Sequence, residues 1–149
     1  MKNIALFIGI LLFIGCTPQN ENELSPSEYQ ALLEQTVLPI PDSALTAEQM
    51  EMKIKLLDIC HTHICIEGNC QKLSVGKDLF EKEGLPAIYY DVLQYQIKES
   101  NEAIKRWIAE DEALSDHFSR LNQDSMMKAT HEYYWNTERP RLMKLLQAK

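Results

Sequence analysis

The chain has 149 residues, enough for one modest domain once any export segment is set aside. Its 22 acidic and 15 basic residues give a formal net charge of −7, which disfavours direct binding to nucleic acid or anionic lipid head groups. The five glycines and six prolines are too few for a turn-rich all-β fold. Leu, Glu, Lys, Gln, Ala and Met are frequent and favour helices.

The first residues have the pattern of an export signal. Lys2 gives a short basic start, and residues 4–14 follow without a charge. A membrane-spanning helix needs about 20 apolar residues, and this run is roughly half that length. An ordinary secretory cleavage site needs a small residue three positions before the cut, and Phe13 is too bulky for a cut before Cys16. We therefore expect residues 1–15 to be a signal peptide of another kind.

The segment Leu12-Phe13-Ile14-Gly15-Cys16 resembles the lipobox of bacterial lipoproteins, in which a large apolar, a variable and a small residue precede the modified cysteine. The resemblance covers about the first sixteen residues. It implies cleavage before Cys16, a diacylglyceryl thioether on its sulfur and an N-acyl chain on the new amine. More than one acyl chain makes such an anchor stable. Because Thr17 is not an aspartate, the resemblance also implies delivery to the outer membrane, with the periplasmic and the external face both left open.

A polar stretch separates the expected anchor from the expected domain. Residues 16–25 carry no apolar periodicity, which is typical of a flexible tether. About nine such residues have an r.m.s. reach of roughly 17 Å. We expect a single helical domain at residues 26–149 that lies close to the membrane surface.

Two capping boxes mark the first expected helices. Ser25 and Glu28, with proline between them, predict a helix from residue 26 to about residue 37, ended by two prolines. Thr46 and Gln49 predict a second helix, in which apolar residues recur at helical spacing as far as Ile64. This second helix is apolar around much of its circumference, which favours a central position in the core.

The stretch after the second helix has two interpretations. Either the helix continues through Cys65 and turns at Gly68, or residues 62–66 and 70–74 form a small hairpin, since β-branched residues alternate there. Beyond it, Ser74 is expected to cap a short helix that runs through Glu83 and ends at Gly84.

The remaining apolar patterns predict further helices. Pro86 is expected to open the longest one, with apolar positions as far as residue 108. Residues 114–121 continue or restart the pattern, Asp124 is expected to cap a helix through residue 134, and Thr137 to precede a last one. Helices joined by short links pack antiparallel around one core. The predicted fold is an all-α bundle of five to six amphipathic helices.

The stretch from residue 60 to 70 holds every cysteine apart from Cys16. In an oxidising compartment, two of these three are expected to form a disulfide. If the helix continues through Cys65, then Cys60 and Cys65 lie about 8 Å apart, too far for a bridge. Two pairings stay open, Cys65 with Cys70 across the turn and Cys60 with Cys70. The bridge would contribute about 2–3 kcal/mol and would stabilise the turn rather than the fold.

The same stretch has a metal interpretation and a structural one. Zinc accepts thiolate and imidazole ligands, and the candidate ligands are Cys60, His61, His63, Cys65 and Cys70. Known structural zinc sites close with a second, distant pair of ligands, which is not evident here. In the structural interpretation Cys60 is a small buried residue, with the histidines at the rim of the domain.

No catalytic motif stands out in the sequence. The pair His131-Glu132 begins like a zinc-protease motif, but the second histidine would fall at Trp135. Aromatic residues are abundant, and an exposed subset of them is expected at a binding surface if they do not all pack in the core. We therefore expect a non-enzymatic, membrane-anchored interaction or accessory module whose partner is another envelope protein. The sequence identifies no small-molecule ligand. A metal- or redox-responsive lipoprotein and an envelope hydrolase with an unrecognised site are the alternatives.

Overall fold

The computed structural model describes residues 24–67, 70–110 and 123–149 of the chain. Helices take up 73% of these residues and a two-stranded sheet is inserted among them, so the predicted helical class is confirmed in its coarse form. The sheet corrects the prediction of a purely helical fold. In chain order the elements are α2 (Pro26–Leu33), the 3₁₀ turn η1 (Asp42–Ala44), α3 (Ala47–His63), β1 (Ile64–Glu67), β2 (Cys70–Leu73), α4 (Lys77–Lys82), α5 (Ile88–Glu110), α7 (Gln123–Tyr133), the π turn η2 (Tyr134–Glu138) and α8 (Arg139–Gln147).

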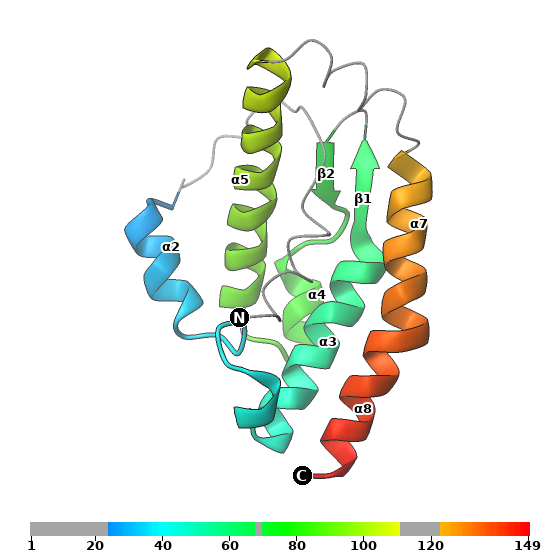
Figure 1. Cartoon of the computed structure of the whole chain (residues 1–149). Helices are drawn as coiled ribbons and strands as arrows, with labels where there is room; N and C mark the ends of the chain where they lie inside the picture. The colour runs from blue at the N-terminus through cyan, green and yellow to red at the C-terminus, as the bar shows by residue number, and fades with distance from the viewer. Residues whose placement is uncertain (1–23, 68–69, 111–122) are drawn as a thin grey trace.

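Helix α3 occupies the middle of the molecule and runs directly into β1 (Figure 1). The long helix α5 lies on one side of it, with α2 along the outer face of α5 (Figure 1). On the other side, α7 and α8 form one line of helix, and α8 packs against α3 (Figure 1). The short helix α4 contacts α5 (Figure 1). Helix α3 therefore connects the two halves of the described core.

Both predicted capping boxes are present. The hydroxyl of Ser25 accepts from the amide of Glu28, and the carboxylate of Glu28 accepts from the amide of Ser25 at 2.7 Å. Thr46 and Gln49 make the same reciprocal pair at the start of α3. These bonds satisfy backbone N–H groups that no helical carbonyl can reach. Helix α2 ends at Leu33, so the predicted end near residue 37 was too late.

The chain forms the hairpin rather than a continued helix after His63. Ile64 pairs with Leu73 in an antiparallel register, and both side chains are buried. The backbone of Gln71 in β2 is held by α5, since the side-chain amide of Asn101 donates to its carbonyl at 2.9 Å and accepts from its N–H at 3.1 Å. A two-stranded hairpin is marginal alone, and these contacts attach it to the helices.

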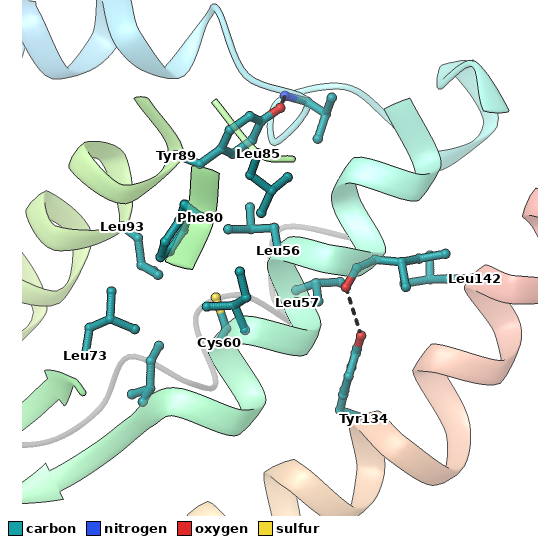
Figure 2. Close-up of a cluster of buried hydrophobic side chains, with 14 of the residues drawn as sticks. Leu56, Leu57, Cys60, Leu73, Phe80, Leu85, Tyr89, Leu93, Tyr134 and Leu142 are labelled. Carbon is teal, nitrogen blue, oxygen red and sulfur yellow. Dashed lines mark hydrogen bonds between the residues drawn. The ribbon is translucent and has the colours of Figure 1, made fainter. Parts of the chain in front are cut away.

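The core surrounds α3, with side chains from α4, α5 and the hairpin and with Tyr134 and Leu142 from the C-terminal helical line (Figure 2). Phe80 is fully buried and comes from the short helix α4, facing Leu56 of α3 and Leu93 of α5 in Figure 2. Tyr89 adds a polar contact, because its hydroxyl accepts from the backbone N–H of Val37 at 3.1 Å. This bond holds the segment after α2 against α5.

The start of α4 differs from the prediction and its end agrees with it. The helix begins at Lys77 with Gly76 as its N-cap, whereas Ser74 donates its hydroxyl to the backbone carbonyl of His63 at 2.9 Å. Ser74 therefore closes the hairpin instead of capping the helix. Gly84 follows the helix with φ +77°, the left-handed conformation that suits glycine.

The C-terminal region is one helical line rather than two capped helices. Helix α7 already begins at Gln123, so Asp124 does not cap it, and no break occurs at Thr137. The long helix α5 begins at Ile88, two residues after Pro86. The predictions for residues 114–121, for the signal segment and for Cys16 fall outside the described residues.

Candidate functional site

The structure separates the residues that the sequence grouped between positions 60 and 70. Cys60 and His61 lie in the last turns of α3 and are buried, and Cys60 belongs to the main core. His63 is half-buried at the end of α3 and faces a groove toward α4. Cys65 is on β1 and Cys70 on β2. These side chains therefore face different surroundings.

Neither expected disulfide is present within the described part of the chain, because Cys60 and Cys65 both carry free thiols. Cys65 is placed opposite Lys72 rather than opposite Cys70, and its thiol donates to the carbonyl of Lys72 at 3.6 Å. Cys70 is opposite Glu67 and lies outside the main core cluster that contains Cys60. The hairpin register thus accounts for the missing bridge between Cys65 and Cys70, and Cys60, a free thiol on α3, is not bonded to Cys70 either.

The zinc interpretation also finds no assembled site in the described residues. No group of three or more His, Cys, Asp or Glu side chains there is placed to hold a metal ion. Burial raises the pKa of the Cys60 thiol to about 12. A thiol with such a pKa stays protonated at neutral pH and is neither a ready nucleophile nor a ready metal ligand.

A different polar cluster forms where α3 meets the C-terminal helical line. We call it the α3–α7 cluster, and its members are Asp58, His61, His131, Tyr134 and Arg139. Tyr134 points from η2 toward α3 (Figure 2), where its hydroxyl donates to Asp58 Oδ1 at 2.6 Å and lies 3.4 Å from the carbonyl of Ile54. Arg139 donates to both oxygens of the same carboxylate, at 2.8 and 3.0 Å. The cluster joins residues about 80 positions apart in the chain.

Two histidines complete the cluster. The imidazole of His61 stacks on the ring of Tyr134, with ring centres 4.1 Å apart and planes inclined by 4°. His131 meets His61 edge-on at 5.3 Å. His61 is 5% exposed, and its buried Nδ1 has no hydrogen-bond partner.

The surroundings favour neutral imidazoles. Burial, reinforced by the neighbouring His131 and opposed by Asp58, lowers the pKa of His61 to about 4. Burial also lowers the pKa of His131. The pKa of Tyr134 is raised by burial and by its hydrogen bond to the carboxylate of Asp58. At neutral pH the cluster therefore holds one ion pair, two neutral imidazoles and a neutral phenol.

This arrangement is suited to holding helices together. The carboxylate of Asp58 is already engaged by Arg139 and Tyr134, so it does not serve as an orienting group for either histidine. Nucleophilic catalysis needs an activated nucleophile within hydrogen-bond reach of its base. The nearest thiol, Cys60, has a raised pKa and is buried.

The π turn explains why the cluster forms where it does. Pro140 lacks a backbone N–H, and a proline ring inside a regular helix clashes with the carbonyl four residues earlier, here that of Asn136. The helix instead widens into the π turn η2, in which the N–H of Arg139 donates to the carbonyl of Tyr134, five residues back. The helical line thus passes Pro140 without ending, and Tyr134 and Arg139 both reach Asp58.

Two aromatic side chains beside the cluster are unusually exposed. Tyr133 is 47% and Trp135 is 41% exposed. The guanidinium of Arg139 lies 5.4 Å from the ring centre of Trp135, and Trp135 meets Tyr134 edge-on. Residues two apart in a helix point in nearly opposite directions, so Tyr133 and Trp135 are expected on different flanks of the helical line.

An open groove of about 230 Å³ lies next to the same carboxylate, between α3 and α4. Its lining residues come from α3, from α4 and from the C-cap of α4: Lys55, Asp58, Ile59, Thr62, His63, Leu79 and Glu83. Charges of both signs line it, so it does not select a ligand by charge alone.

The sequence did not indicate Asp58 and Arg139 as members of a site. Tyr134 and His131 were considered only as parts of a predicted helix, and His131 also as part of an incomplete zinc-protease motif. The available signal was Pro140 inside an otherwise helical pattern, since a proline that does not end a helix marks a local irregularity. π turns of this kind are frequent at functional sites.

Comparisons with known protein families, curated proteins and solved structures find no match to this chain. In the part of the chain that the structure describes, no helix is both long and apolar enough to cross a membrane.

Proposed function

We propose that this protein is a lipid-anchored lipoprotein of a bacterial cell envelope and that its helical domain is a non-enzymatic interaction module. The observation that carries the anchor is the segment Leu12-Phe13-Ile14-Gly15-Cys16, which follows an uncharged run of signal-peptide length. The lipids in this proposal are a diacylglyceryl group and an N-acyl chain on Cys16. In this proposal the lipoprotein is delivered to the outer membrane, because the residue after Cys16, Thr17, is not an aspartate.

The position of the first described helix supports a short tether. Helix α2 begins at Pro26, ten residues after Cys16, and its capping box makes this start well defined. In the proposal, residues 16–25 connect the lipid to a bundle of five to six helices at residues 26–149. The polar composition of the tether and its reach of roughly 17 Å keep the domain near the membrane surface. The acidic net charge leaves protein partners as the more suitable ligands there.

The exposed flank at Trp135 supports the binding role. Tyr, Trp and Arg are the residues that most often dominate the binding energy of protein interfaces. Here Trp135 is 41% exposed and carries the guanidinium of Arg139 on its ring, which fixes the side chains in advance. A preordered anchor loses little conformational entropy on binding. We assign the partner to another envelope protein that contacts this flank.

The anchor is tested by mass spectrometry of the protein purified from the membranes of a two-membrane bacterium. The expected mature chain begins at Cys16 and carries the mass of the added acyl groups. Cys16→Ser should abolish both the added mass and the membrane association, whereas the matched control Cys65→Ser should keep them. A mature chain that begins elsewhere, or an unacylated Cys16, would contradict the proposal.

The binding role is tested with a photo-crosslinking amino acid in place of Trp135 in the intact anchored protein. The expected result is a discrete cross-linked product with an envelope protein. The same substitution at Glu48, which is exposed at the start of α3, should not give that product. If both positions give the same products, or Trp135 gives none, this flank is not the binding surface.

A further inference from the structure

The C-terminal helical line is attached unevenly to the rest of the protein. None of the α7 side chains between Met127 and Tyr133 is buried. From Met127 to the end of the chain, the buried residues of the line are Tyr134 in η2 and Leu142 in α8. Helix α8 has two ion-pair anchors in addition, because Arg139 binds Asp58 and Arg141 binds Asp42 at 2.6 Å. The described contacts therefore hold α8 more firmly than α7.

The contact between α7 and α3 depends on uncharged imidazoles. His131 lies edge-on to His61, and His61 stacks on Tyr134 at the point where α7 continues into η2. A proton on His61 would create a buried cation, and its Nδ1 faces no acceptor. Burying a charge without a partner is costly, so protonation is tolerated only if the ring becomes exposed.

Among the residues that the structure describes, the charged and titratable groups around His61 do not compensate such a cation. On α3 these are Asp58 and the protonated thiol of Cys60. On the facing line they are His131, Tyr134 and Arg139. Asp58 is the one anion among them, and it is shared between Arg139 and Tyr134. A second cation on His131, 5.3 Å away, would add repulsion.

We propose that α7 is an acid-released arm: protonation of His61 and His131 separates it from α3, while α8 stays docked and the π turn acts as the hinge. The hinge position follows from Pro140, which already interrupts the regular hydrogen-bond ladder at this point. Opening exposes the face of α3 that α7 covers, including the ring of His61. The pH outside the cytoplasm follows the surroundings more closely than the pH inside, so an envelope protein would encounter this signal.

The anchors of α8 persist at the same acidity. Burial alone would raise the pKa of Asp42, but hydrogen bonds from Lys53 and Arg141 outweigh it and lower that pKa below the usual 3.8. The carboxylate therefore stays charged at pH values where the two imidazoles take up protons. In contrast, the pKa of His61 lies near 4 in the closed state against 6.5 when exposed. The packing of α7 against α3 therefore loses stability as the pH falls from about 6.5 toward 4.

Hydrogen–deuterium exchange of the full chain in a mild non-ionic detergent tests the inference, with rates corrected for intrinsic pH dependence. The equilibrium constant for separating α7 from α3 is called its opening constant. The change in the pKa of His61 alone should raise this constant roughly 80-fold between pH 8 and pH 4.5. The amides of α7 should lose protection by about this factor, while those of α3 and α8 should not. Unchanged protection of α7, or simultaneous loss in α3, α7 and α8, would overturn the proposal.

Substitutions separate the titration from simple loosening. His61→Phe keeps an aromatic ring against Tyr134 but cannot be protonated, and combined with His131→Gln it should remove the acid response of α7. His63→Gln is the matched control, since His63 lies on the same helix but faces the groove. An acid response that survives the double substitution, or disappears in the control, would contradict the assignment to His61 and His131.

Discussion

The hydroxyl of Tyr134 provides a defined test of the α3–α7 cluster. Tyr134→Phe removes one oxygen and keeps the ring stacked on His61. The lost bond is short, 2.6 Å to Asp58 Oδ1, and its acceptor is charged. Hydrogen bonds to charged groups contribute about 1.5–3 kcal/mol. Asp58 is 27% exposed and keeps both bonds from Arg139, so its carboxylate is not left unpaired after the substitution.

We therefore expect a loss of about 1 kcal/mol in the free energy of unfolding, below the usual range for a charged acceptor. This corresponds to roughly a fivefold change in the unfolding constant and about 3–5 °C in Tm for a domain of this size. Urea unfolding followed by circular dichroism measures it. The neighbouring substitution Tyr133→Phe is the control, because Tyr133 is 47% exposed, and it should change stability by less than about 0.3 kcal/mol.

A double-mutant cycle isolates the bond from other effects of the substitution. Combining Tyr134→Phe with Asp58→Ala should cost less than the sum of the two single changes, with a coupling of about 1 kcal/mol. A zero coupling, or equal losses in Tyr134→Phe and Tyr133→Phe, would show that the cluster does not join α3 to the C-terminal line in the way described.

Three further predictions follow from the core, the hairpin and the α8 anchor. Phe80→Ala should lower the unfolding free energy by about 3–5 kcal/mol in urea titrations, because Phe80 is fully buried. Asn101→Ala should cost about 2 kcal/mol and speed amide exchange in β2, because both its hydrogen bonds go to the backbone of Gln71. Asp42→Asn should lower stability at neutral pH and flatten its pH dependence below about pH 4, because the lowered pKa of Asp42 makes its contribution disappear only as pH falls through that value.

Less buried positions supply the controls for these three changes. Leu79→Ala, in the same helix as Phe80 but half-buried, should cost clearly less, and Asn136→Ala should leave β2 exchange unchanged. Asp78→Asn, at an exposed carboxylate, should keep the acid dependence of the parent protein. Equal losses in a test variant and its control would contradict the corresponding contact.

The parts of the fold that were predicted correctly depend on residues close together in the chain. The box of Ser25 and Glu28 and the box of Thr46 and Gln49 each satisfy backbone groups within one helical turn, so a stretch of four residues determines the outcome. Gly84 ends a helix by its own backbone preference. Such features do not need knowledge of the tertiary structure.

The hairpin shows where local patterns left two outcomes. The residues around Ile64 suit either a helix or a strand by pattern alone. The contact that favours the strand comes from Asn101, 30 residues beyond Gln71, whose amide binds the backbone of β2. Ser74 was assigned to a helix cap for the same reason, although its hydroxyl binds the carbonyl of His63 across the hairpin. Each decision depends on a partner that a short window of sequence does not include.

The α3–α7 cluster depends even more strongly on residues that are far apart in the sequence. The sequence emphasised His61 for its neighbours Cys60 and His63, yet the side chains that surround its ring are 70 and 73 positions later, His131 and Tyr134. A helix places adjacent residues about 100° apart, so a dense run of cysteine and histidine is dispersed by the helix rather than gathered by it. The imidazole that was expected at a rim therefore lies inside an interface, where an added proton has no acceptor. Under the proposal above, protonation of this imidazole is therefore coupled to the separation of α7 from α3.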